Sequence, residues 1–159
     1  MNFTSWSREE ISIYLPHKGT MMLIDKIESF TENEIIAKSI NHLDINHPLL
    51  KENRLGLAIG IEYAAQASAI HSRINAEVNI QNIDKHLPNV QTSLAPIIPG
   101  KLVSVREINC FSKYLNIPKT SLIISAKQEQ VSAQALIYSF LVANENQKLI
   151  SGRLMIHLG

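Results

Sequence analysis

The sequence has 159 residues, of which 45% are hydrophobic and 18% charged, and its formal net charge is +1. This balance is typical of a single domain, residues 1–159, and it excludes a bulk electrostatic attraction to nucleic acid or to an anionic membrane. Cys110 is the only cysteine, so the chain has no internal disulfide. The polar start of the chain predicts no secretory signal, and no apolar run reaches the roughly 18 residues of a membrane span. We therefore expect a cytoplasmic protein.

The chain begins with a predicted short helix and a β-hairpin. Ser7 and Glu10 have the spacing of a capping box, and Pro16 ends the helix that they begin. The apolar run Met21–Phe30 predicts a strand, and Glu34–Ile40 predicts a second strand after a short turn. Two strands joined in this way are expected to pair as a hairpin.

One long helix and four further strands follow. An irregular stretch, residues 41–55, precedes a helix predicted over Gly56–Ile74, which is apolar nearly all round and is therefore expected to be buried on all sides. Residues 75–99 have weak periodicity and are interpreted as loop or partly strand. The four strands are predicted over Lys101–Lys113, Ser121–Gln130, Ser132–Ala143 and Lys148–Leu158. Because their links are short, consecutive strands should pair antiparallel.

This order of elements predicts the fold class. A lone helix that is apolar all round has to be wrapped, and one curved antiparallel sheet can do so. The sequence therefore predicts an α+β architecture.

Glu62 interrupts this apolar helix and is the first candidate site residue. An ionised carboxylate in apolar surroundings is costly unless it is paired or protonated. Gln66, one turn further on the same face, can hydrogen-bond to it, whereas Arg73 is about 16 Å further along the axis. Burial without a charged partner raises the pKa of a carboxyl group and suits it to general acid catalysis. The alternative is that Glu62 reaches solvent or caps a loop, and the sequence leaves both open.

His47 is the second candidate, in the irregular stretch before the helix. Pro48 restricts it to extended conformations, and the start of the helix offers free amides at Leu57 and Ala58 at the positive end of the helix dipole. An acid, a base and an oxyanion-binding helix terminus would then lie within one segment. The alternative is an ordinary structural or solvated loop histidine. No residues have metal-ligand spacing and no glycine-rich phosphate loop occurs, so no metal or cofactor is predicted.

Three stretches together resemble a known family: LPHKGTMMLIDKI from Leu15, the pair His47-Pro48, and GIEYAAQA from Gly60. They resemble the hotdog-fold 3-hydroxyacyl-[acyl-carrier-protein] dehydratases, and most closely the dehydratase-like branch associated with aryl polyene biosynthesis. The resemblance implies the hotdog fold, a curved antiparallel sheet wrapped around one long central helix. It also implies that two subunits pair sheet to sheet, with the histidine of one and the acid of the other forming each site.

The resemblance implies a role for each candidate residue. His47 would take the α-proton of a (3R)-3-hydroxyacyl thioester, and Glu62, oriented by Gln66, would protonate the departing 3-hydroxyl group to give the trans-2-enoyl product. The amides of Leu57 or Ala58 would bind the carbonyl oxygen. The implied partners are an acyl carrier protein with its phosphopantetheine-linked chain and a second hotdog subunit, either a homodimer mate or a different chain. The implied setting is fatty acid or aryl polyene-type lipid biosynthesis.

Departures from the family pattern keep two alternatives open. Asn46-His47-Pro48 stands where the family usually has Gly-His-Phe-Pro-Gly, and Thr20 stands where proline is usual. The alternatives are a non-catalytic acyl-binding subunit of a hetero-oligomer and a hotdog acyl thioesterase. His17, in the LPHKG segment, is interpreted mainly as a structural anchor at the entry to the first strand.

Overall fold

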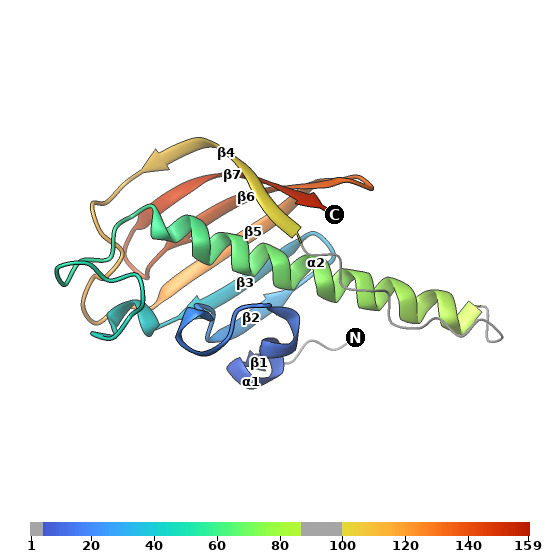
Figure 1. Ribbon diagram of the computed structural model, residues 1–159, viewed down its shortest axis with the longest axis horizontal. Coiled ribbons are helices and arrows are strands. Elements are labelled where there is room, and N and C mark those ends of the chain that lie inside the picture. The colour runs from blue at the N-terminus through green and yellow to red at the C-terminus, as the bar shows by residue number, and fades with distance from the viewer. Residues whose placement is uncertain (1–4, 87–99) are drawn as a thin grey trace.

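The structure, a computed structural model, describes residues 5–86 and 100–159. Figure 1 shows a single curved sheet with one long helix lying across one of its faces, and the N-terminal segment packed beside that helix. This is the predicted α+β arrangement, a curved antiparallel sheet around one central helix, and it confirms the hotdog fold. The elements are β1 (Trp6–Ser7), α1 (Arg8–Ile11), η1 (Ser12–Tyr14), η2 (Gly19–Met21), β2 (Lys26–Phe30), β3 (Glu34–Ser39), η3 (Asn41–Leu43), α2 (Ile59–His86), β4 (Gly100–Cys110), β5 (Leu122–Val131), β6 (Ala135–Ala143) and β7 (Lys148–Leu158).

The sheet has seven strands in the order β1-β2-β3-β5-β6-β7-β4, and each neighbouring pair is antiparallel. The hairpin β2–β3 and the meander β5–β6–β7 pair as predicted. The expectation that β4 pairs with β5 is wrong, because β4 pairs with β7 at the far edge and β5 pairs with β3. The link between β4 and β5 spans residues 111–121, which is long enough to cross the end of the sheet instead of forming a tight hairpin.

The N-terminal segment confirms one prediction and corrects another. Ser7 precedes α1, and its backbone N–H donates to Glu10 Oε2 at 2.7 Å, as a capping box requires. The strand predicted from Met21 begins only at Lys26. The apolar residues before it are held by polar side chains from the helix and from η3, so their main chain is not available to the sheet.

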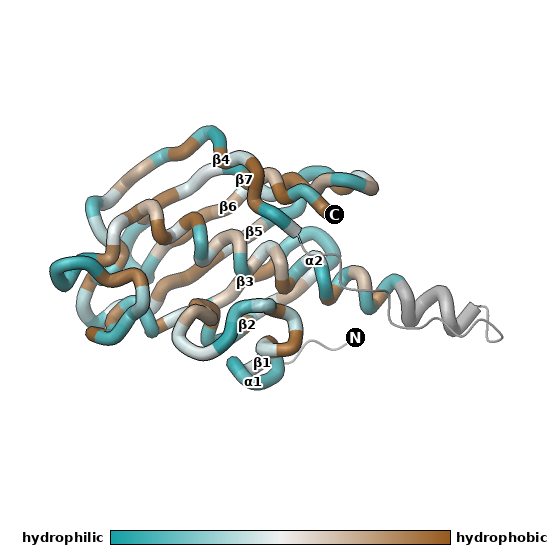
Figure 2. The backbone as a smooth tube through the Cα atoms, in the orientation of Figure 1, coloured by the Kyte–Doolittle hydropathy of each residue, from teal (hydrophilic) through white to brown (hydrophobic). Residues whose placement is uncertain are grey.

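Helix α2 begins three residues later than predicted and continues to His86, twelve residues beyond the predicted end at Ile74. Over residues 59–75 no side chain is fully exposed, which fits the prediction of a helix wrapped on all sides. In Figure 2 hydrophobic and pale residues outnumber hydrophilic ones along the first half of the helix, and hydrophilic residues become more frequent toward the part drawn in grey. The sequence predicted the end of the helix at the point where the apolar pattern weakens. A helix that extends beyond the core can continue without that pattern.

Two glycines allow close approach within the core. A Cβ on Gly60 of α2 would lie 2.6 Å from Ile150 Cγ2, so a side chain here would push the helix away from the sheet. A Cβ on Gly152 of β7 would lie 2.5 Å from Ile108 Cδ1 and 3.0 Å from the main-chain oxygen of Arg106. The lack of side chains at these positions therefore lets α2 and β4 pack against β7.

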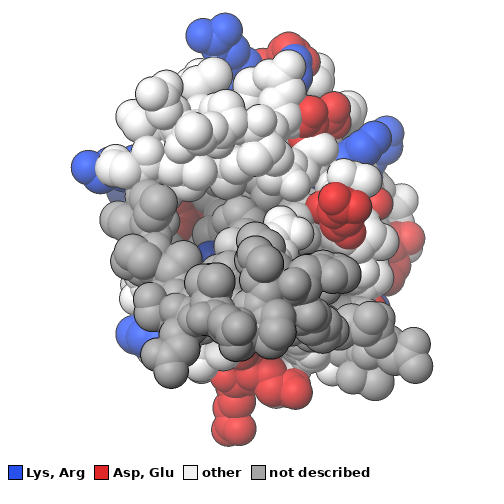
Figure 3. Space-filling view, turned by 90° about the vertical axis from the view of Figure 1, so that its right-hand side faces the viewer, with Lys and Arg blue, Asp and Glu red and all other residues white. Residues whose placement is uncertain are grey.

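The surface agrees with the low net charge. Figure 3 shows side chains of both signs interspersed with uncharged ones on the face at the C-terminal end of α2, without a large field of one sign. Among the helices that the structure describes, none combines the length and the apolar character that crossing a bilayer requires.

Candidate functional site

Glu62 lies in the first turn of α2 and is the centre of the candidate site. Its side chain is 35% exposed, so it is neither sealed in the core nor freely solvated. Gln66 Nε2 donates a hydrogen bond of 3.0 Å to Glu62 Oε1, which is the (i, i+4) contact predicted from the sequence. The carboxyl group is therefore oriented from within its own helix.

Gln66 does more than orient Glu62. Its side chain is buried, with 1% of the residue exposed, and its Oε1 accepts a hydrogen bond from the backbone N–H of Leu23 at 2.8 Å. Its Nε2 also donates to the main-chain oxygen of Met21 at 2.9 Å. Gln66 therefore fixes the segment before β2 against the helix, and this contact replaces the strand pairing that the sequence predicted for Met21 and Leu23.

A pocket of about 270 Å³ opens beside Glu62, between α2, the N-terminal segment and the edge formed by β4 and β7. Ala65 and Ala69 follow Glu62 along the helix and form a low floor, because small side chains leave space above them. Leu102 of β4 and Ile156 of β7 form an apolar wall. The pocket can therefore hold a largely apolar ligand with a polar group placed at Glu62.

His17 is the second polar group at this pocket, and the sequence did not predict its position. His17 Nε2 lies 3.3 Å from Glu62 Oε1, and 34% of its side chain is exposed. The turn that follows depends on Gly19, whose φ of 57° lies in the left-handed region that favours glycine. Arg8 donates to the main-chain oxygen of Gly19 at 2.9 Å and also forms an ion pair with Asp25. The LPHKG segment is therefore anchored at several points, which places His17 over the carboxyl group.

His47 lies elsewhere, against the neighbouring residue of the helix. It is 5% exposed, and its Nε2 is 3.2 Å from the hydroxyl oxygen of Tyr63, while its Nδ1 accepts a hydrogen bond of 3.2 Å from the backbone N–H of Leu49. Successive helical residues point about 100° apart. Glu62 and Tyr63 therefore face different sides of α2, and within one chain no hydrogen bond or ion pair among the described residues joins His47 to Glu62.

The hydrogen bonds around Tyr63 define the tautomer of His47. Asn41 Nδ2 donates to the main-chain oxygen of Leu23 at 2.9 Å, so Asn41 Oδ1 is the atom that faces Tyr63 and accepts its hydroxyl hydrogen. The Tyr63 oxygen is then left to accept the hydrogen on His47 Nε2. With Nδ1 accepting from Leu49, the ring is neutral and both nitrogens are occupied.

Burial acts in the same direction as these hydrogen bonds. Desolvation lowers the pKa of His47, and the nearby charge of Asp44 opposes this only in part. Desolvation also raises the pKa of the Tyr63 hydroxyl. The network is therefore neutral near pH 7, and His47 has no free lone pair in this arrangement.

The two predicted oxyanion amides lie directly before the helix. Leu57 and Ala58 form the turn that leads into α2, whose first main-chain bond in this region runs from the N–H of Ile59 to the oxygen of Gly56 at 3.0 Å. Ala58 is exposed and Leu57 is buried. Their proposed contact with a carbonyl oxygen stays a prediction.

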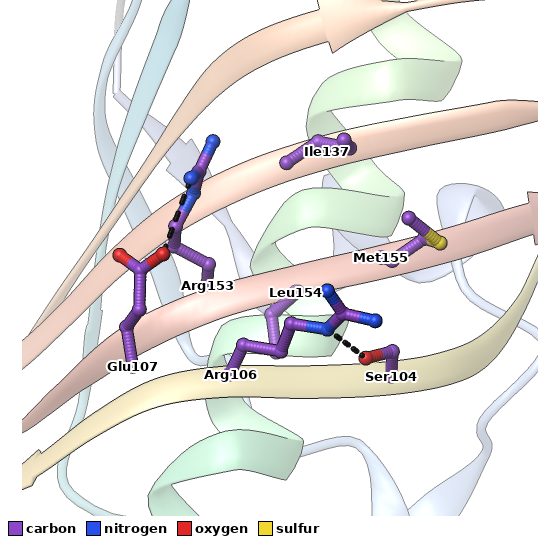
Figure 4. Close-up of a pocket in the computed structure, with 7 residues that line it drawn as sticks. All are labelled: Ser104, Arg106, Glu107, Ile137, Arg153, Leu154 and Met155. Carbon is purple, nitrogen blue, oxygen red and sulfur yellow. Dashed lines mark hydrogen bonds and ion pairs between the residues drawn. The ribbon is translucent and has the colours of Figure 1, made fainter.

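A smaller hollow of about 120 Å³ lies on the face of the sheet away from α2 (Figure 4). Its arginines already have partners: Arg153 pairs with Glu107 at 3.3 Å, and Arg106 Nε donates to Ser104 Oγ at 3.3 Å. It has no histidine next to a carboxyl group among its lining residues. The pocket at Glu62 is therefore the better candidate for chemistry.

The comparison with protein families matches nearly the whole chain. A sequence model of the ApeP-like family, described as ApeP dehydratase, covers residues 9–158. The chain belongs to the ApeP-like dehydratase family. The family resemblance predicted from the three sequence stretches is thereby confirmed. No protein with a curated description matches this chain.

Several solved structures share this fold. The dehydratase heterocomplex ApeI:P from Xenorhabdus doucetiae matches with a TM-score of 0.70 at 18% identity, over 94% of this chain and 90% of that one. The HP0420 homologue from Helicobacter felis matches with a TM-score of 0.60 at 12% identity, over 99% and 93%. A hypothetical thioesterase with coenzyme A from Streptococcus pneumoniae TIGR4 matches with 0.54 at 11%, over 84% of each chain. At these identities the likeness shows the fold alone.

The contact between Glu62 and Gln66 was predicted from the sequence, whereas the contacts of His17 with Glu62 and of Tyr63 with His47 were not. His17 is 45 positions before Glu62, and no spacing rule links residues so far apart. Tyr63 carried a usable signal, because a tyrosine inside an apolar helix needs a partner for its hydroxyl group when it is buried. That rule predicts a polar neighbour for Tyr63, although it does not identify the neighbour as His47.

Proposed function

We propose that this member of the dehydratase family converts (3R)-3-hydroxyacyl thioesters, carried by the phosphopantetheine arm of an acyl carrier protein, to trans-2-enoyl thioesters. The observation that carries the proposal is the half-buried carboxyl group of Glu62, held by Gln66 at the edge of a largely apolar pocket. Loss of water from a 3-hydroxyacyl group needs an acid for the departing hydroxyl group and a base for the α-proton. Glu62 is the proposed acid.

The shape of the pocket supports an acyl substrate. Ala65 and Ala69 extend the groove along α2 from Glu62, and apolar side chains of β4 and β7 form the opposite wall. An acyl chain lying there would exclude water from the reacting carbons, which strengthens electrostatic interactions with the carboxyl group.

The reaction also needs a base, and His47 and His17 are the two candidates. The family resemblance assigns the base to His47 of a paired subunit, with the amides of Leu57 or Ala58 binding the carbonyl oxygen. For His47 to act in this way, its ring has to leave Tyr63 and Leu49, because both of its nitrogens are occupied in the described chain. His17 is the other imidazole.

The sheet edge supports pairing with a second hotdog subunit, either a second copy or a different chain. In the part of the chain that the structure describes, β4 pairs only with β7, so its other edge is open. Several large apolar side chains on or next to β4 are exposed: Leu102, Val103, Ile108 and Phe111. An open edge with apolar side chains is a template for pairing with another sheet. The heterocomplex found for ApeI:P supports a different hotdog chain as one candidate for the partner.

The test is a direct assay with a carrier-bound substrate. Purified protein is incubated with a 3-hydroxyacyl-carrier protein, and mass spectrometry follows the loss of one water from the acyl group. We expect dehydration by the wild type and a loss of roughly 100-fold or more for Glu62→Gln, which removes the acid but keeps the size and the contact with Gln66.

Other products would point to other functions. Hydrolysis to the free acid would contradict dehydration and identify a thioesterase. The third outcome is that the protein binds the acyl carrier protein but gives no product, even when light scattering shows that it is a dimer. This outcome would identify a non-catalytic acyl-binding subunit. His47→Ala, measured in the same assay, separates the role that the family resemblance gives to this residue from a structural one.

A further inference from the structure

Glu62 and His17 are in contact inside one chain. His17 Nε2 and Gln66 Nε2 both contact the same oxygen, Glu62 Oε1, at 3.3 Å and 3.0 Å. One of these nitrogens belongs to an amide that can only donate, and the other belongs to an imidazole ring, whose nitrogens can donate or accept. The carboxyl group is therefore oriented by Gln66 and is in contact with the imidazole of His17.

His17 and His47 differ in what they can reach. His17 lines the pocket with Glu62, and about a third of its side chain is open. His47 is nearly fully buried on another side of the helix, with Nε2 on Tyr63 and Nδ1 on Leu49. A substrate in the pocket can therefore contact His17 and Glu62 together without any change in the chain.

His17 is also held firmly enough to serve a reaction. Its segment turns at Gly19, is tied to α1 through Arg8, and is held to the helix where Gln66 binds the main chain of Met21. A base has to be within hydrogen-bond reach of the proton that it removes, and a fixed segment maintains that geometry.

We propose that His17 is the catalytic base and acts with Glu62 of the same chain, an inference that rests on the proposed dehydratase function. His17 Nε2 first takes the α-proton, and the electron pair of that C–H bond is held as the enolate of the thioester. The enolate then forms the Cα–Cβ double bond as the Cβ–O bond breaks. The leaving hydroxyl group takes the proton of the Glu62 carboxyl group and departs as water. His17 is then protonated and Glu62 ionised, and transfer of one proton across their 3.3 Å contact restores both groups.

The assignment makes a single chain sufficient for the acid and the base. A paired subunit would then contribute to the walls of the pocket or to the docking of the carrier protein, and not to the proton transfers. This differs from a site shared between two chains, in which removing His47 would abolish the removal of the α-proton.

The test separates the two proton transfers. Wild type and variants receive a 3-hydroxyacyl thioester of pantetheine in D₂O, and mass spectrometry measures dehydration together with deuterium incorporation at Cα of the remaining substrate. We expect His17→Gln to lower both rates by roughly 100-fold or more, the usual range for a general base. Glu62→Gln should lose dehydration and still incorporate deuterium. The matched control is His157→Gln, an exposed histidine at the end of β7, which should behave like the wild type.

The outcomes are distinct. If His17→Gln dehydrates and exchanges at the wild-type rate, or if His47→Gln stops exchange while His17→Gln does not, the base is not His17 and the dehydratase function stands. If the wild type gives no enoyl product, the proposed function fails and the base assignment fails with it. Circular dichroism and urea unfolding of His17→Gln check that the variant is folded, so that a lost rate reports on the base.

Discussion

Tyr63→Phe is the sharpest test of the buried network around His47. The substitution removes only the hydroxyl group, which accepts the Nε2 hydrogen of His47 and donates to Asn41 Oδ1. Tyr63 is fully buried and His47 nearly so, and water cannot readily replace the lost oxygen. The Nε2 hydrogen and the Oδ1 atom would then both lack a partner.

The expected magnitude follows from these two groups. A buried polar group left without a partner costs about 1–3 kcal/mol. Because Asn41 is on the rim of the network and can relax, we expect Tyr63→Phe to lower the free energy of unfolding by about 2–4 kcal/mol. Urea unfolding followed by circular dichroism measures this, and with a slope of about 1–3 kcal/mol/M the midpoint should fall by roughly 1–2 M. All samples need the same protein concentration, because pairing of subunits would itself stabilise the fold.

Tyr14→Phe is the matched control. The hydroxyl group of Tyr14 donates to Glu77 Oε2 at 2.9 Å. Tyr14 itself is buried, but Glu77 is partly exposed, so water can replace the lost hydroxyl group. Its loss should therefore cost less than about 1 kcal/mol. In addition, nitrogen NMR of the wild-type imidazole should show the hydrogen of His47 on Nε2 and a bare Nδ1. Equal losses for Tyr63→Phe and Tyr14→Phe, or a wild-type hydrogen on Nδ1, would refute the network as described.

Three further predictions concern packing, pH and the site. Gly152→Ala should lower the free energy of unfolding, measured in urea, by about 1–3 kcal/mol, because its Cβ would lie 3.0 Å from a main-chain oxygen that cannot move aside. The control is Gly56→Ala, whose Cβ would have nothing within 4 Å and which should change the same free energy by less than about 0.5 kcal/mol. Desolvation lowers the pKa of His42 to about 4, against about 6.5 in the unfolded chain, so the unfolded chain binds the extra proton between these values and stability should fall by about 3 kcal/mol as the pH drops from 6.5 to 4. Urea unfolding across this range should show a flatter decline for His42→Gln, and an unchanged slope would contradict the assignment. Gln66→Met keeps the length of the side chain but removes its three hydrogen bonds. We expect the free energy of unfolding to fall by about 2–4 kcal/mol and dehydration, measured by mass spectrometry, to be at least tenfold slower. Unchanged dehydration would show that Gln66 does not orient Glu62.

Most helices and strands could be predicted from the sequence, because the pattern of apolar and polar residues within each segment indicates its structure. The capping box at Ser7, the strand after the first turn and the apolar helix around Glu62 are local signals. The structure confirms all three elements, although the helix begins later and ends later than predicted. The partner of β4 was not predictable in the same way. A strand pattern shows that a segment is extended, whereas the choice between two neighbours depends on where the preceding helix delivers the chain.

The error before β2 has a different origin. Met21 and Leu23 are apolar and read as strand, but their main-chain groups bond to the side chain of Gln66, more than forty residues later. Hydrophobic periodicity describes which side chains are buried and contains no information on which main-chain groups a distant amide will satisfy. The same limit hid the contact between His17 and Glu62, since both features arise from one docking of the N-terminal segment against α2.

That docking also connects the two polar networks beside α2. The backbone N–H of Leu23 donates to Gln66 Oε1 at 2.8 Å, and the carbonyl oxygen of Leu23 accepts from Asn41 Nδ2 at 2.9 Å. Gln66 also hydrogen-bonds to Glu62 in the pocket, and Asn41 hydrogen-bonds to Tyr63, which in turn contacts the buried His47. The segment before β2 therefore supports both the exposed contact between His17 and Glu62, which we propose as base and acid, and the buried, neutral His47. The LPHKG segment thereby places His17 at the pocket, and the residues after it bind Gln66 and Asn41, which lead to the two networks.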